Sequence, residues 1–172
     1  KAVRTPWRSL AGMLSLEPGA TAAAAAAFAD VPPHERTLCA QQIARGVNAP
    51  LVSSMGRLFD AAACVLGLRT ESLYEGQAAM ELEFAVTPGV TDSYPFALHE
   101  TEPFVVDWEP AIRGLLDDRG HKVADGVMAA RFHNLLANTI LAIAQRCNRS
   151  KVVLSGGCFQ NRYLAERVTG QL

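Results

Sequence analysis

The sequence predicts an α/β domain that is rich in helices and has a small mixed sheet, and three observations support this prediction. Helical patterns fill most of the first half of the chain. Two short segments in the middle, residues 94–99 and 104–108, are rich in aromatic and β-branched residues. Near the end, the apolar run 152–154 reaches Ser-Gly-Gly, and a helix-compatible segment follows at once. This order favours an α/β layer over a helix bundle or a β-sandwich.

The first half of the chain predicts a series of helices separated by turn residues. Pro32 and Pro33 separate the second helix from the third, and Gly46 suits the C-terminal cap of the third. Ser53 or Ser54 can cap the fourth helix, whose apolar residues lie on one stripe. The predicted helices cover residues 7–16, 20–29, 34–45, 55–66 and 76–84.

The second half predicts a small sheet and then an alternation of helix and strand. The segments 94–99 and 104–108 are expected to form a hairpin. Two helices should follow, at 109–118 and at 123–147, the second being the longest periodic segment of the chain. A buried strand is expected at 151–154, followed by the Ser-Gly-Gly turn and a final helix.

Composition excludes several classes of partner. The chain has 172 residues, of which 49% are hydrophobic and 19% charged, as in a globular domain with a sizeable core. The formal net charge of −1 provides no overall basic field for nucleic acid. No apolar run approaches the length of a membrane span, and the alanine run 22–27 is too short to be one. We therefore expect neither nucleic acid nor a membrane as a partner.

The cysteines and histidines indicate no metal site. No pair of cysteines has C-x-x-C spacing, so we expect free thiols in a reducing, cytoplasmic environment. No two histidines have the spacing of zinc ligands. The residues concerned are Cys39, Cys64, Cys147, Cys158, His34, His99, His121 and His133.

The turn at Ser155, Gly156 and Gly157 is the main candidate site. Adjacent glycines let backbone N–H groups converge where a Cβ would clash, and we expect one of the two to have a positive φ. Converging N–H groups before a helix favour an anion, most often a phosphate. The same residues also suit an ordinary tight connection between a strand and a helix.

Two further segments place a glycine beside polar side chains at a helix start. Gly56 precedes Asp60, whose carboxylate could accept hydrogen bonds from ribose hydroxyls, and Gly76 follows Glu75. Each has a plainer alternative. Gly56 could serve close helix packing, and Asp60 could be a solvated or capping carboxylate.

These segments together resemble the C-terminal part of HypF-type carbamoyltransferases, which are maturation factors of NiFe hydrogenases. The resemblance spans essentially the whole chain, in order. It rests on residues 6–8, 48–61, 74–83, 107–108, 132–133 and 154–162. It implies that residues 1–172 form the second lobe of an actin-like (ASKHA) fold, a single incomplete domain similar to the TsaD-type transferases.

The resemblance also implies a reaction and a set of ligand-binding residues. In this family, carbamoyl phosphate and ATP yield carbamoyl adenylate, and the carbamoyl group then passes to the C-terminal cysteine of the partner protein HypE. The turn would face phosphate, the residue after it would be polar, and two motifs would lie near ribose and base. The residues matched to these nucleotide-binding roles are Ser155, Gly156, Gly157, Asn161, Gly56, Asp60, Glu75 and Gly76.

Departures from the family pattern set further expectations. The acylphosphatase, zinc-finger and YrdC-like segments and the first lobe find no counterpart in this sequence, so we expect weak or absent ATP binding and no catalysis by the chain alone. No catalytic residue and no metal ligand of the family can be assigned here, and His133 and Cys158 are interpreted as packing residues. The alternative is a non-catalytic module that binds a maturation partner. An isolated lobe would also expose apolar surface, which predicts a homodimer.

Overall fold

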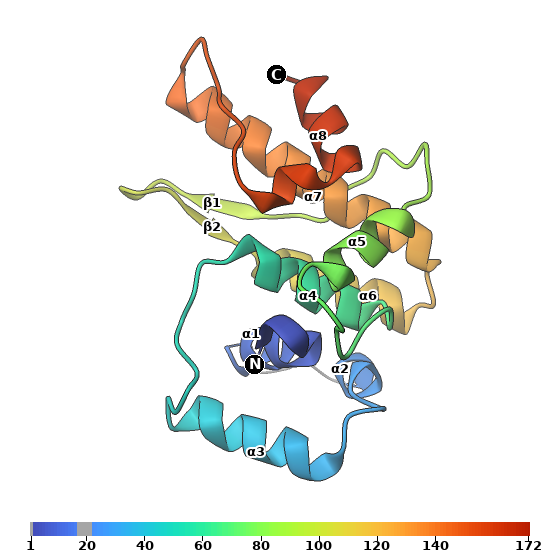
Figure 1. Ribbon diagram of the computed structural model, residues 1–172. Coiled ribbons are helices and arrows are strands. Elements are labelled where there is room, and N and C mark those ends of the chain that lie inside the picture. Colours follow the sequence, from blue (N-terminus) through green and yellow to red (C-terminus); the bar gives the residue numbers. More distant parts are fainter. Residues whose placement is uncertain (1, 17–21) are drawn as a thin grey trace.

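The structure is a computed structural model that describes residues 2–16 and 22–172, and it consists mainly of helices (Figure 1). The helices lie close to their predicted limits, although residues 20 and 21 of the predicted second helix fall outside the described part. They are η1 (Ala2–Arg4), α1 (Pro6–Ser15), α2 (Ala22–Ala27), α3 (Pro33–Ala44), α4 (Met55–Val65), α5 (Gln77–Phe84), α6 (Glu109–Gly120), α7 (Asp125–Cys147), η2 (Gly157–Gln160) and α8 (Arg162–Thr169).

The predicted hairpin is confirmed. Strands β1 (Ala97–His99) and β2 (Val105–Asp107) pair antiparallel, with Leu98 opposite Val106. Within the described residues the sheet contains these two strands alone, so it is antiparallel where a mixed sheet was expected.

The buried strand predicted at 151–154 is wrong. No backbone ladder includes these residues in the described part of the chain, and they run as an extended segment. The side chain of Val153 is 88% exposed, and only Leu154 packs against the core. An apolar run becomes a strand only where a neighbouring strand accepts its backbone hydrogen bonds, and the hairpin does not supply one here.

Helix α4 lies at the centre of the core. Every residue from 58 to 65 is buried, and Ala61, Ala62 and Ala63 have no exposed surface. Small side chains let neighbouring helices approach closely, and α1, α5 and α6 all pack against α4. Figure 1 shows α4 between α3 at one end of the molecule and α8 at the other.

Helix α7 was not expected to resemble a membrane span, but by length and composition it is apolar enough to cross one. More than half of its apolar window is buried inside the protein, and Phe132 and Leu135 are fully buried. Ring packing joins Phe132 to Phe59 of α4, with centroids 5.2 Å apart. These contacts are those of a core helix, which is equally apolar on its buried faces.

A polar cluster fastens α6 and α7 to the segment before β1. The Tyr94 hydroxyl donates to Asp118 of α6 over 2.7 Å, and Arg131 of α7 donates to the same carboxylate oxygen over 2.7 Å. Burial, followed by the hydrogen bond to Asp118, raises the pKa of Tyr94 well above its ordinary value. Tyr94 therefore remains an un-ionised donor across the physiological pH range.

We predict that G126A destabilises the protein by about 1–3 kcal/mol, because overpacking strains a filled site. A Cβ on Gly126 would collide with the Thr87 hydroxyl and would lie 2.7 Å from the Ala85 carbonyl oxygen. Urea unfolding followed by circular dichroism measures the change. The matched control is G12A inside α1, where a Cβ meets no atom within 4 Å, and helix propensity there favours alanine. Equal stability of wild type and G126A would contradict the packing at this site.

Candidate functional site

The turn at residues 155–157 opens toward solvent and leaves backbone donors free. Gly156 has a φ of +104°, which confirms the predicted positive φ, and all three residues are exposed. No hydrogen bond in the described part of the chain uses the N–H of Gly156 or Gly157. The turn then closes as η2, in which the Phe159 N–H donates to the Gly156 carbonyl oxygen over 3.2 Å. Two successive free N–H groups before a short helix suit an anion.

Asn161 is buried and caps the last helix. Its Oδ1 accepts the N–H of Leu164 over 2.8 Å, which satisfies a donor in the first turn of α8. Its Nδ2 lies 2.8 Å from Nε2 of His133 on α7. The side chain that was assigned to nucleotide binding therefore has both ends occupied within the protein.

His133 is fully buried, as its interpretation as a packing residue requires, and it also makes polar contacts. Its Nδ1 lies 2.8 Å from the Ala129 carbonyl oxygen, one helical turn earlier. Its ring packs edge-on against Phe59 and Tyr163, with centroids 5.7 and 5.5 Å away. Burial lowers the pKa of His133, against smaller raising effects from the Ala129 carbonyl and Glu83, so the ring is neutral.

Glu83, a residue that the sequence did not single out, binds the N-terminus of α8. Its Oε1 accepts the N–H groups of Arg162 over 2.7 Å and of Tyr163 over 3.2 Å. A carboxylate here meets the positive end of the α8 dipole. The start of the final helix, which was expected to favour an anion, is therefore already occupied by Glu83. The donors that make no hydrogen bond in the described part of the chain are those of the glycine turn.

Asp60 is buried beside Arg57, in the first half of α4. Arg57 Nη2 lies 2.8 Å from Asp60 Oδ2, an ion pair whose angle does not make a hydrogen bond, and Oδ2 has no hydrogen-bond partner. Burial raises the pKa of Asp60 to about 6, against a smaller lowering by Arg57. The alternative of a solvated carboxylate is therefore wrong.

Gly56 has room for a side chain in the described structure. A Cβ there would lie 3.7 Å from Ser54 Oγ, an ordinary contact, so close packing within this chain does not require glycine. The packing alternative for Gly56 therefore has no support here. The residue lies in the first turn of α4, half-buried, on the same helix as Asp60.

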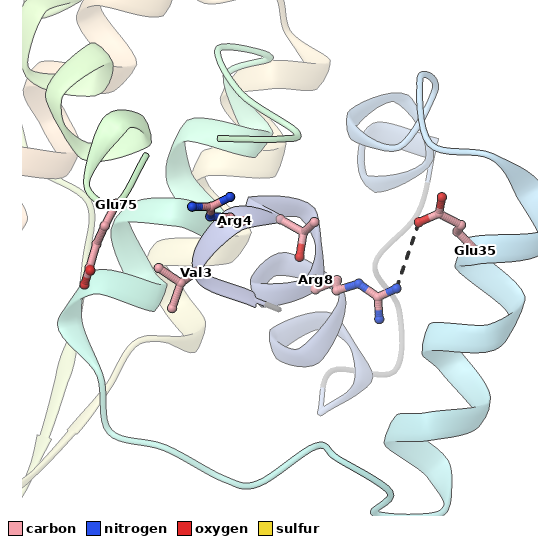
Figure 2. A pocket seen from close by; sticks show the side chains of 6 residues that line it. Val3, Arg4, Arg8, Glu35 and Glu75 are labelled. Atoms are coloured by element: carbon pink, nitrogen blue, oxygen red, sulfur yellow. Dashed lines mark ion pairs between the residues drawn. The ribbon is translucent and has the colours of Figure 1, made fainter. Parts of the chain in front are cut away.

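The motif at Glu75 and Gly76 lies apart from the turn. Gly76 has a φ of +83° and precedes α5. Glu83, which contacts the start of α8 next to the turn, lies at the other end of α5, about 10 Å from Gly76 at 1.5 Å per residue. Glu75 is exposed and lines a pocket of about 500 Å³ with Arg4, Arg8 and Glu35 (Figure 2). Arg8 is already paired there, 3.9 Å from Glu35. The predicted residues thus lie in three places. Glu75 lines this pocket with Gly76 beside it in the chain, and Gly56 and Asp60 lie on α4. Ser155, Gly156, Gly157 and Asn161 lie at the turn.

Side-chain contacts connect α4 to the turn. Phe59, the neighbour of Asp60 in the chain, packs on His133, and His133 contacts Asn161. Among the described residues no cluster of three or more His, Cys, Asp or Glu side chains could hold a metal ion. Sequence reasoning missed the roles of His133 and Glu83, although both belong to segments that carry the family resemblance.

Comparison with known proteins gives matches over the full length of the chain. The family model described as carbamoyltransferase, Kae1-like domain, second subdomain, matches residues 1–172. The chain belongs to the HypF family of carbamoyltransferases. A solved structure of full-length HypF in a phosphate- and nucleotide-bound form superposes with a TM-score of 0.88 at 34% identity, covering 98% of this chain and 22% of that one. The α/β class, as the second lobe of an actin-like fold, is thereby confirmed.

Curated relatives carry the same family name. Carbamoyltransferase HypF of a Synechocystis species is 46% identical over 119 residues, which cover 68% of this chain and 15% of the relative. A HypF homologue of Cupriavidus necator is 33% identical over 186 residues, covering 99% of this chain and 46% of the relative. The chain therefore spans less than half the length of these HypF proteins.

We predict that D60N raises the free energy of unfolding by about 1–2 kcal/mol at pH 8, because the charged form of Asp60 is disfavoured by burial. The folded pKa of about 6 exceeds the ordinary 3.8. As the pH falls from 6 to 3.8 the folded state binds more protons than the unfolded state, and wild-type stability gains from this group. The advantage of D60N should shrink over that window.

Urea unfolding at several pH values tests this expectation. The control is D117N, which changes an exposed aspartate of α6 and should have little effect at any pH. A D60N protein less stable than wild type at pH 8 would mean that the pairing with Arg57 outweighs the burial of the carboxylate.

Proposed function

We propose that this chain forms one wall of the ATP site of a HypF carbamoyltransferase and presents the nucleotide phosphates to the turn at residues 155–157. In the proposed reaction, carbamoyl phosphate and ATP give carbamoyl adenylate, and the carbamoyl group passes to the C-terminal cysteine of a HypE-type protein during NiFe hydrogenase maturation. Asp60 and Gly56 on α4, and Glu75 and Gly76 before α5, would lie toward ribose and base.

One observation carries the proposal more than any other. Gly156 and Gly157 offer two successive free N–H groups on an exposed turn, in a chain that matches a phosphate- and nucleotide-bound HypF structure at a TM-score of 0.88. Backbone donors that are fixed by a glycine turn suit phosphate oxygens of any nucleotide. The buried Asp60 adds a carboxylate on α4, and a ribose hydroxyl would have to reach it in place of Arg57, whose Nη2 lies 2.8 Å from Asp60 Oδ2.

The exposure of these groups sets the expected affinity. The turn, Glu75 and Gly76 are all exposed in the part of the chain that the structure describes, so water screens and competes with every contact to phosphate. Carbamoyl transfer needs reactants held together out of water. We therefore infer that the 172-residue chain binds ATP weakly, and that catalysis needs the first subdomain of the Kae1-like domain and the segments that process carbamoyl phosphate.

We predict that G157L abolishes the ATP-induced rise in melting temperature and leaves the fold intact. Gly157 has no positive φ, and a Cβ there meets no atom within 4 Å, so leucine fits without strain. Its side chain would nevertheless cover the free N–H groups. Differential scanning fluorimetry at millimolar ATP measures the effect.

The matched control for this experiment is G120L. Gly120 ends α6, is exposed and also has open space around a Cβ, but it lies on a different element from the turn. G120L should therefore keep the ATP-induced shift. An unchanged shift in G157L would place the nucleotide elsewhere on the molecule.

We predict that the chain alone gives no carbamoyl-phosphate-dependent exchange of pyrophosphate into ATP, because the proposed site is open to water on one side. The measurement uses labelled pyrophosphate with and without carbamoyl phosphate. Exchange clearly above a control without protein would contradict the inferred need for the first subdomain. Exchange restored by adding the first subdomain together with the acylphosphatase and YrdC-like segments as separate polypeptides would support it.

A second function is favoured by the exposed apolar side chains. Leu51, Leu73, Phe84 and Val153 are each between 77% and 89% exposed, and apolar side chains of this size could contact a maturation partner wherever they lie close together. In that case the chain would be a non-catalytic interaction module. ATP titration separates the two functions, since a module of this kind should show no nucleotide affinity even at millimolar concentration.

A further inference from the structure

We propose that His133 is a positioning residue for the phosphate-binding turn. Its unprotonated Nε2 holds the side-chain amide of Asn161 in the one orientation that caps α8 and fixes residues 156–161. The link to phosphate rests on the proposed function, whereas the orientation of Asn161 does not.

The tautomer of His133 follows from its hydrogen bonds. The Ala129 carbonyl oxygen can only accept, so the Nδ1 atom that lies 2.8 Å from it must carry the proton. In a neutral ring Nε2 is then a bare acceptor. The group of Asn161 that lies 2.8 Å from Nε2 must therefore be its NH₂, which donates.

The orientation of Asn161 follows in turn. With its NH₂ toward His133, its Oδ1 faces the Leu164 N–H and accepts it over 2.8 Å. A flipped amide would place oxygen against the Nε2 lone pair and NH₂ against the Leu164 N–H, which gives two repulsive contacts in a buried site. His133 thus selects the capping orientation, and a buried donor or acceptor left without a partner is destabilising.

Asn161 also closes the turn through its backbone. Its N–H donates to the Cys158 carbonyl oxygen over 3.2 Å, and the Phe159 N–H donates to the Gly156 carbonyl oxygen over 3.2 Å. Gly156 and Asn161 are therefore the two ends of one short hydrogen-bonded unit. A shift of Asn161 is therefore passed through these two hydrogen bonds to Gly156 and Gly157, which carry the free N–H groups.

The surroundings of His133 decide what protonation would do. Phe59 of α4 and Phe132 of α7 provide apolar contacts, and the titratable groups facing the ring are Glu83 of α5 and Tyr163 of α8. Glu83 is already bound by two N–H groups of α8. A proton on Nε2 would set a donor against the Asn161 NH₂, so the cap should weaken as the pH falls below the ordinary histidine value of 6.5.

Three variants isolate this contact in the full 172-residue chain. H133Q offers a carbonyl oxygen at similar reach to Nε2 and does not titrate, so it should keep the cap at every pH. H133L offers no acceptor, so it should lose the cap at every pH. N161S keeps a good capping residue but cannot reach His133, so α8 should remain capped without pH dependence.

Amide hydrogen exchange of Leu164, expressed as a protection factor between pH 5 and 8, is the first measurement. In wild type the protection factor should fall at least fivefold from pH 8 to pH 5. In H133Q and N161S it should not change with pH. In H133L it should be at least fivefold lower than in wild type at pH 8, and it should stay low at every pH. Circular dichroism at the same pH values reports global folding. If H133L does not fold, the comparison of H133Q and N161S with wild type still tests whether His133 positions Asn161.

The second measurement is titration with inorganic phosphate, followed by the amide resonances of Gly156 and Gly157. We expect both resonances to move in wild type and H133Q and to respond less in H133L. If the two resonances do not move in wild type, phosphate does not bind at the turn. The role of His133 is then decided by the protection of Leu164 alone. Equal Leu164 protection in wild type and H133L, or the same pH dependence in H133Q as in wild type, would overturn the positioning role.

Discussion

The burial of α4 is the constraint on which the rest of the structure depends. The helix is covered on most of its circumference, and its three successive alanines leave no exposed surface. Because these side chains are small, α1, α5 and α6 pack directly against the helix. A larger side chain at any of these alanines would have to displace a neighbouring helix, since protein interiors have little free volume.

The position of the glycine turn is fixed from α4 through packing and not through a strand of its own. Phe59 packs on Phe132 and His133, His133 contacts Asn161, and Asn161 caps α8. Only Leu154 of the segment before the turn packs against the core. The turn is therefore held from its C-terminal side, where the hydrogen bonds are, and its N-terminal side adds little.

The helices could be predicted from the sequence because each carries its own periodicity and its own boundary residues, such as Pro33 and Gly46. Local sequence did not predict the conformation of residues 151–154, because a strand also needs a neighbouring strand, and local sequence does not show whether one is present. The positive φ of Gly156 was predictable, because glycine adjacency is a local signal. The contacts His133–Asn161 and Glu83–Arg162 join residues 28 and 79 positions apart, and no local pattern announces them.

Glu83 divides the donors near the turn into two sets with different roles. The N–H groups of Arg162 and Tyr163 are used within the protein, where a carboxylate meets the positive end of α8. The N–H groups of Gly156 and Gly157 make no hydrogen bond in the described part of the chain, and they are the donors that we propose bind phosphate. A phosphate at the turn would accept from two backbone donors but would gain little from the dipole of α8. It would also lie near the negative charge of Glu83, which is bound at the start of the same helix. Like charges repel, so binding at this turn should require a cation or a basic side chain to balance the phosphate. Among the described residues no cluster of metal-binding side chains could hold the cation. The basic side chain at this helix start is Arg162, which is exposed and pairs with Glu166 over 2.6 Å, so it would have to leave Glu166 to balance the phosphate.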